Sequence, residues 1–268
     1  MKLAVVDKSN KKVGDLEMPP QFSEEVRLDL IHKAVIVVQN NNRQQYGADP
    51  MAGNKASSYL SKRRHSYRGS YGFGISRTPR KILTRRGRRM YWVGATAPNT
   101  RGGRRSHPPK SEKIFSLDMP IKERRKAIRS AMAATLDKEL AALRGHKVPD
   151  AYPFVVDDSI CKVSKTKELL DALKKIGFEA DLKRAEDRKV RAGIGKLRGR
   201  KYKTKKSLLI VVKDKCAVQL SARNVPGVEI AEVAYLNAEL LAPGTYPGRL
   251  TVWTKGALEL LKEKKVYM

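Results

Sequence analysis

The stretch between Arg43 and Lys110, called the arm below, carries far more positive charge than a folded segment can bury. It holds seventeen Lys or Arg residues, one acid (Asp49), nine glycines and seven aromatic residues, and its apolar runs are short. Such a segment cannot form a hydrophobic core of its own, so something outside the chain must neutralise it. Apolar helical patterns precede it (Val26 to Val38) and follow it (Ile121 to Leu140), so the arm is inserted in a domain and is not a tail.

The whole chain shares this charge imbalance. Fifty-seven Lys and Arg residues against 27 Asp and Glu give a net charge of +30, for which a polyanion is the natural partner. The basic residues lie among Gly, Ser, Pro and Tyr and form no amphipathic helix with an apolar face, which favours phosphate backbones over a membrane. The most apolar helical stretch, Ile31 to Val38, is far shorter than the roughly 20 residues of a membrane span. The N-terminus is typical of a first strand and not of a signal peptide, so we expect a cytoplasmic protein.

The residues outside the arm, 1–42 and 111–268, have ordinary globular composition and a size of about 200 residues that suits one domain. Short apolar runs alternate with helical patterns, which predicts an α/β fold with three layers and a mostly parallel central sheet. We expect strands at 3–6, 154–156, 208–212, 228–233 and 250–253, a polar turn at 8–14, and helices at 23–40 (N-cap Ser23), 121–143 (ended by Gly145), 164–176 (ended by Gly177) and 254–261 (N-cap Thr254).

A second basic stretch runs from Lys183 to Lys206, with twelve Lys or Arg residues against Glu186 and Asp187. Three glycines at its centre allow the backbone to approach a phosphate closely, while the neighbouring cations supply charge. The alternative is a solvated linker before the strand at 208–212. A linker needs no such charge density, which favours a contact with phosphate.

Catalytic and metal signals in the sequence are weak. Cys161 and Cys216 are far apart, without a Cys-x-x-Cys pair or a His at metal spacing, and we expect both to be buried small hydrophobes. Asp157 and Asp158 are adjacent on an extended chain, so their side chains point to opposite faces and do not converge. The run Gly193-Ile-Gly-Lys-Leu197 lacks the Ser or Thr that holds magnesium in a phosphate loop. We therefore expect no enzyme activity, cofactor, metal or small-molecule substrate.

Four segments carry a more specific signal. The strongest is Arg101-Gly-Gly-Arg-Arg-Ser-His-Pro-Pro-Lys110, and the others are Gly72–Arg80, Arg191–Arg200 and Asn224–Val228. Their order and spacing over the whole chain resemble the universal L-four family of large ribosomal subunit proteins, in its archaeal and eukaryotic branch. The chain stops at Met268 without the long basic extension typical of eukaryotic members, so the resemblance favours the archaeal side.

The resemblance implies a globular domain on the outside of the large subunit and a long loop that reaches through rRNA to the narrow part of the nascent-peptide exit tunnel. Expected partners are large-subunit rRNA, neighbouring large-subunit proteins and the nascent peptide near the arm tip. Unpaired bases can stack on the aromatic residues of the arm, which are Tyr46, Tyr59, Tyr67, Tyr71, Phe73, Tyr91 and Trp92. The expected rRNA-binding residues are Arg43, Lys55, Lys62, Arg63, Arg64, Arg68, Gly72, Gly74, Arg77, Arg80, Lys81, Arg85, Arg86, Arg88, Arg89, Arg101, Gly102, Gly103, Arg104, Arg105, His107, Lys110, Arg191, Lys196, Arg198, Arg200 and Lys201.

Our main hypothesis is a structural, rRNA-organising constituent of the large ribosomal subunit. Two alternatives stay open. A free RNA-binding regulator could use the same arm to hold an mRNA leader that mimics rRNA. An RNA-modifying or RNA-cleaving enzyme would need a convergent Asp/His/Lys set or a complete cofactor loop, and the sequence shows neither.

Overall fold

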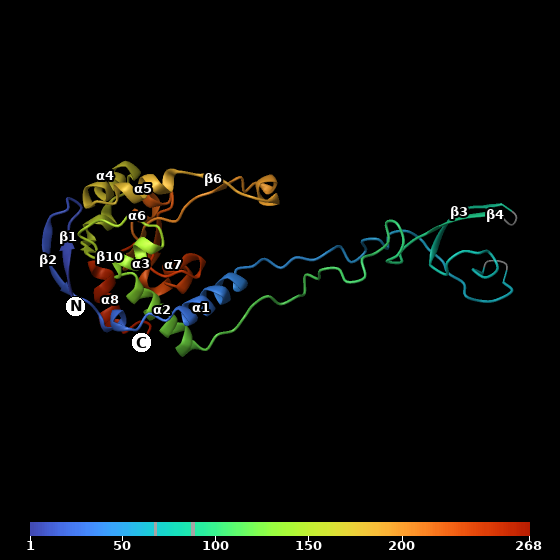
Figure 1. Cartoon of the computed structure of the whole chain (residues 1–268), viewed down its shortest axis with the longest axis horizontal. Coiled ribbons are helices and arrows are strands. Elements are labelled where there is room, and N and C mark those ends of the chain that lie inside the picture. The colour runs from blue at the N-terminus through green and yellow to red at the C-terminus, as the bar shows by residue number, and fades with distance from the viewer. Residues whose placement is uncertain (67–68, 87–88) are drawn as a thin grey trace. The chain divides into compact units, whose positions relative to one another are not determined.

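The computed structural model describes residues 1–66, 69–86 and 89–268 of the chain (Figure 1). The chain divides into two compact units. The first unit contains Met1–Asn42 and Ser116–Met268, and the second unit contains Arg43–Phe115.

A six-stranded sheet forms the centre of the first unit, with strand order β2-β1-β5-β10-β8-β9. All neighbouring strands are parallel except the antiparallel pair β1 and β2. This arrangement confirms the predicted α/β fold with a mostly parallel sheet. The strands are β1 (Lys2–Val6), β2 (Lys12–Glu17), β5 (Val155–Val156), β8 (Leu209–Val212), β9 (Glu229–Glu232) and β10 (Thr251–Thr254).

Both faces of the sheet are covered by helices. Side chains alternate along each strand, so Leu209 and Val211 face one apolar core while Ile210 and Val212 face the other. The first core includes residues of α1 (Leu28–Asn41), α2 (Ile121–Ala134), α7 (Ala238–Leu241) and α8 (Lys255–Lys264). The second includes residues of α4 (Thr166–Ile176), α5 (Glu179–Glu186) and α6 (Val218–Ala222).

Two predicted helices have different bounds in the structure. The helix expected at 23–40 begins only at Leu28, because Glu24 to Arg27 are held extended against α2. There the Ser130 hydroxyl accepts a hydrogen bond from the Arg27 N–H (2.6 Å) and donates one to the Glu25 carbonyl (2.8 Å). The N-cap prediction for Ser23 was therefore wrong, since a tertiary contact outweighs the local signal.

The helix expected at 121–143 is two helices, α2 and α3 (Lys138–Leu143). Asp137 starts the second by accepting hydrogen bonds from the Glu139 and Leu140 N–H groups. Gly145, with φ +92°, follows its end as predicted.

Sequence patterns also missed strand β2. The turn expected at 8–14 ends earlier, and Lys12–Glu17 pairs with β1. Most of its side chains are exposed, so the strand lacks the apolar pattern that reveals the buried strands. Also missed were the short helices α5, α6 and α7.

The N-terminus of α8 is capped from a distant segment. Thr254 precedes the helix as predicted, but its side chain makes no capping bond. Instead the Asp158 carboxylate accepts from the Gly256 N–H at 3.0 Å. Asp157 accepts from the Ser159 N–H in its own turn, so the two adjacent carboxylates have separate structural roles.

A buried polar network joins α5 to β8. Asp181 is fully buried and accepts hydrogen bonds from the Lys147 N–H (3.0 Å), from Arg184 Nε (2.8 Å) and from the Ser207 hydroxyl. His146 Nδ1 lies 3.2 Å from the same carboxylate. Burial raises the pKa of Asp181, but the hydrogen bonds from His146, Arg184 and Ser207 outweigh it and hold that pKa below its usual value.

We predict that Asp181→Asn lowers the free energy of unfolding by about 3–5 kcal/mol, because it removes the buried carboxylate that accepts from the Arg184 guanidinium, the Ser207 hydroxyl and the Lys147 N–H. Urea unfolding near pH 7 measures this loss. The pKa of Asp181 is lower in the folded protein than the value of about 3.9 in the unfolded chain. The network therefore stabilises the wild-type fold fully above about pH 3.9, and this contribution is lost as the pH falls from there through the folded-state pKa.

The matched control is Asp150→Asn, at an exposed carboxylate 3.5 Å from Lys138. A loss under about 0.5 kcal/mol is expected there. Equal losses of unfolding free energy in both variants would show that the buried network stabilises the fold no more than an exposed ion pair does.

Candidate nucleic-acid interface

The second unit contains an antiparallel hairpin and several turns, and few of its described residues are buried. The hairpin consists of β3 (Arg80–Arg86) and β4 (Arg89–Gly94), and Tyr59 forms an isolated bridge with Arg80. Sequence patterns missed this hairpin because its strands are so rich in charge. Among the described residues of the unit only Gly69, Ser70 and Ala95 are buried. In the described part of this unit, backbone hydrogen bonds and turns contribute more to the shape than apolar packing does.

Aromatic and cationic side chains form a stacked group in residues 43–115. The rings of Tyr46 and Phe115 are parallel within 12°, with centroids 5.8 Å apart. The Arg43 guanidinium carbon lies 4.2 Å from the centroid of the Phe115 ring, and Lys113 Nζ lies 5.6 Å from it. Phe115 and Lys113 lie beyond the arm as predicted from the sequence and were missed; an aromatic residue among lysines was the available signal.

A hollow of about 650 Å³ lies beside this stacked group. It combines aromatic, imidazole and proline surfaces with exposed cations, which suits a flat base and its phosphate. The residues that line it are Tyr46, Arg105, His107, Pro108, Pro109, Lys110, Glu112, Lys113 and Phe115.

Tyr71 lies beside two guanidinium groups. The guanidinium carbons of Arg64 and Arg77 are 5.6 and 5.4 Å from its ring centroid, and Arg77 donates to the Tyr71 hydroxyl at 3.2 Å. Three predicted contact residues therefore form one local cluster.

Arg80 has an internal role. Its guanidinium donates to the Trp92 carbonyl (3.2 Å) and to the Ser76 carbonyl (2.9 Å) and hydroxyl (2.8 Å). These bonds use much of its donor capacity to hold the loop before β3 against β4. The half-buried indole N–H of Trp92 has no acceptor among the described residues.

The predicted glycines fall into two kinds. A Cβ at Gly103 would lie 2.0 Å from the Ala97 carbonyl oxygen, so the tight turn there requires glycine. Gly72 and Gly74 have φ values of +80° and +65°, and a Cβ at either would meet open space. Their backbone is therefore accessible to a ligand.

The remaining predicted residues differ in exposure. Lys55 is exposed and forms an ion pair with Asp49 at 3.0 Å. Lys81 and Arg191 are half-buried. Tyr67, Arg68 and Arg88 lie outside the described residues, and for Arg85, Arg86, Arg89 and Tyr91 the structure describes only the backbone. The other predicted cations and His107 are exposed, namely Arg43, Lys62, Arg63, Arg64, Arg77, Arg101, Arg104, Arg105, Lys110, Lys196, Arg198, Arg200 and Lys201.

The second basic stretch is a hairpin and not a linker. Strands β6 (Lys189–Val190) and β7 (Tyr202–Lys203) pair, and a 3-10 turn at Ile194–Arg198 forms the tip. We call residues 189–203 the basic hairpin. Figure 1 shows it projecting from the end of α5, away from the sheet. The Arg191 N–H donates to the Lys201 carbonyl at 2.8 Å, which closes its neck.

Charge is divided along the basic hairpin. At its root Lys205 pairs with Asp187 (2.6 Å) and Lys206 with Glu229. Within the described residues, Lys196, Arg198, Arg200 and Lys201 have no acid within ion-pair distance. Leu197, between them, is 82% exposed. The outer part therefore presents free cations and apolar surface for a partner to cover, and the sequence had not indicated that apolar surface.

The two cysteines lie closer than their spacing suggested and are half-buried instead of buried. Burial and the neighbouring Cys216 raise the pKa of the Cys161 thiol to about 12, which makes it a poor nucleophile. The described part of the chain contains no group of His, Cys, Asp or Glu side chains arranged for a metal ion. None of its helices is long and apolar enough to cross a membrane.

The exposed cations and the α/β fold are consistent with the protein family that a comparison of sequences identifies. The model of the ribosomal protein L4/L1 family matches residues 16–264, which include the arm and the basic hairpin. The chain belongs to this family. The resemblance inferred from the motifs is thereby confirmed.

Similar proteins cover the whole chain. The large ribosomal subunit protein uL4 of Nanoarchaeum equitans is 46% identical over 268 residues, which are 100% of both chains. The protein of the same name from Methanococcoides burtonii is 45% identical and covers 95% of each chain. That from Archaeoglobus fulgidus is 42% identical over 98% of this chain and 99% of its own. These archaeal relatives support the archaeal side of the resemblance.

We predict that trypsin cleaves the free protein within residues 43–110 before it cleaves the first unit, because the described part of the second unit buries few apolar side chains that would oppose local opening. Mass spectrometry of early fragments locates the cuts. The many Lys and Arg sites of the first unit are the internal control. Resistance of residues 43–110 while those sites are cut would contradict the prediction.

Proposed function

We propose that the chain is a structural, non-enzymatic protein of the cytoplasmic large ribosomal subunit that binds and organises rRNA. The observation that carries this proposal is the set of exposed cations without acidic partners on the basic hairpin, together with the arm, in a member of a ribosomal protein family. Phosphate groups of rRNA would neutralise these cations, and the release of condensed counterions would favour binding.

The arm and the first unit would divide the work. We infer that residues 1–42 and 111–268 act as one domain that docks on rRNA through the basic hairpin. Residues 43–110 would then penetrate the rRNA, with the segment Gly72 to Arg89 as the deep tip near the constriction of the exit tunnel and the nascent peptide. The aromatic and guanidinium groups of the arm suit irregular, unpaired RNA, which offers base faces for stacking.

The contribution of the basic hairpin is testable by salt dependence. Replacing Lys196, Arg198, Arg200 and Lys201 by Gln should flatten the slope of log affinity against log salt by about 3 for single-stranded RNA, since each phosphate contact contributes about 0.7. Fluorescence anisotropy with the full chain and a labelled single-stranded RNA measures the slope.

Four exposed lysines that already form ion pairs provide the matched control, namely Lys12, Lys33, Lys165 and Lys255. Their replacement by Gln changes the net charge equally and should leave the slope nearly unchanged. Equal effects of the two variants would mean that total charge, and not the basic hairpin, determines binding.

Incorporation into subunits tests the function itself. We expect that the four hairpin substitutions reduce the tagged protein in large subunits several-fold, because docking needs this exposed surface first. Deleting Gly72 to Arg89 should leave incorporation largely intact, because the tip contacts rRNA only after the rRNA has folded around the arm. Gradient fractionation of cells that express tagged wild-type and variant chains gives the measurement. Equal losses would contradict the division of work, and absence of the wild-type chain from large subunits would overturn the function and favour a free regulator.

A further inference from the structure

Strand β9 is the outer strand of the sheet, and in the described part of the chain it pairs only with β8. The Glu229 N–H donates to the Leu208 carbonyl at 3.0 Å, so it points toward β8. Because backbone groups alternate in direction along a strand, those of Ile230 and Glu232 point to the free edge. A free edge of this kind is a template for another strand.

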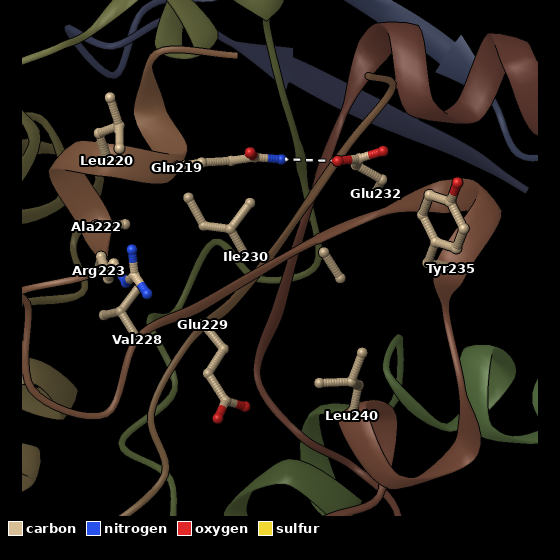
Figure 2. Close-up of a pocket in the computed structure, with 11 residues that line it drawn as sticks. Gln219, Leu220, Ala222, Arg223, Val228, Glu229, Ile230, Glu232, Tyr235 and Leu240 are labelled. Atoms are coloured by element: carbon tan, nitrogen blue, oxygen red, sulfur yellow. Dashed lines mark hydrogen bonds between the residues drawn. The ribbon is translucent and has the colours of Figure 1, made fainter. Parts of the chain in front are cut away.

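A groove of about 770 Å³ follows this edge. One wall is formed by Gln219 and Leu220 of α6 and by Arg223 directly after it, and the opposite wall carries Tyr235 and Leu240. Figure 2 shows Ile230 between the two walls, and above it the Gln219 carboxamide donating to the Glu232 carboxylate.

The walls expose apolar surface on both sides of the edge. Leu220 and Tyr235 are each 75% exposed, although both sit next to well-packed elements of the first unit. A strand placed along β9 would direct alternate side chains toward these two residues, which is the usual way that an added strand obtains specificity.

The charge of the groove differs from that of the rest of the chain. Glu229 and Glu232 line it with one cation, Arg223. Glu229 is already engaged by Arg249 (2.6 Å) and Lys206. The carboxylate of Glu232 is bonded to the neutral Gln219 at 3.1 Å and has no cationic partner among the described residues.

We propose that the β9 groove binds an extended segment of another protein of the large subunit, which adds as a strand to β9 and places a Lys or Arg side chain against Glu232. RNA is a poorer occupant, because the free edge of β9 offers hydrogen bonds to a peptide backbone, and the Glu232 carboxylate, which has no cationic partner among the described residues, would repel a phosphate. A second copy of this chain is also poorer, since each copy would bring the same carboxylates to the shared edge.

The inference rests on the proposed function in one respect, the presence of neighbouring proteins in the subunit. The experiment replaces Leu220 by the photoreactive amino acid p-benzoylphenylalanine in the tagged full chain. Gradient fractions of large subunits are irradiated, and adducts are identified by mass spectrometry. Absence of the tagged wild-type chain from the subunit fractions would count against the proposed function; its presence allows the groove to be tested separately.

The expected result is an adduct with an extended, basic segment of one large-subunit protein. Glu232→Gln in the same background should lower its yield about two- to fivefold, the effect of one partly exposed charge pair. Glu263→Gln, which makes the same change of charge on α8, should leave the adduct yield unchanged. The photoreactive group at Leu143, another exposed leucine, should not give this adduct.

An adduct with RNA only, an adduct with a second copy of this chain, or no adduct would overturn the proposal. If the Leu220 variant does not enter subunits, the same replacement at Tyr235 examines the opposite wall. Hydrogen exchange on wild-type protein gives a measurement that needs no variant. The amides of Ile230 and Glu232 should exchange more slowly in the subunit than in the free chain, and equal exchange would also overturn strand addition.

Discussion

The chain has too few acidic side chains to neutralise its basic ones, and its structure depends on where the unpaired cations lie. With 57 basic and 27 acidic side chains, more than half of the cations would lack an acid even if every acid formed a pair. Acids such as Asp181, Glu229 and Glu24 are used inside or beside the first unit, where they hold structural contacts. The arm holds a single acid, and the outer part of the basic hairpin holds none. The surplus thus falls on the parts with the least core.

The first unit holds the root of the basic hairpin in place. The basic hairpin has little core of its own, but its root is tied to helix α5 by Ser207 bonded to Asp181 and to strand β9 by Lys206 bonded to Glu229. Burial raises the pKa of Glu229, but Arg249 and Lys206 outweigh it and lower that pKa, so the carboxylate stays ionised at neutral pH. These contacts attach the basic hairpin to the first unit at two points, so its exposed cations are presented from a fixed base and not from an unattached linker.

The sequence predicted the parts of the fold that apolar pattern controls. Strands β5, β8, β9 and β10 and helix α4 are continuous or periodic in apolar residues, so each was found to within a few residues. Features that depend on distant partners were not found. The start of α1 is set by Ser130, the cap of α8 comes from Asp158, and β2 pairs through its backbone with few buried side chains. Similarly, the composition predicted a basic surface, whereas the cluster at Tyr71 and the internal use of Arg80 depend on tertiary contacts.

These intrachain contacts also bear on how the arm could receive RNA. A base that stacks on Tyr71 or on Phe115 competes with the guanidinium of Arg77 or of Arg43 for the same ring. An exposed cation–π contact is worth about 0.5–1 kcal/mol, whereas stacking of a base on an aromatic side chain is worth about 1–3 kcal/mol. The displaced guanidinium would also gain a phosphate, with a charge-assisted bond that is stronger than its contact with the ring. In the proposed complex the exchange would therefore favour RNA, and the cation–π contacts would keep the rings and cations of residues 43–115 close together at the positions where a nucleotide needs both.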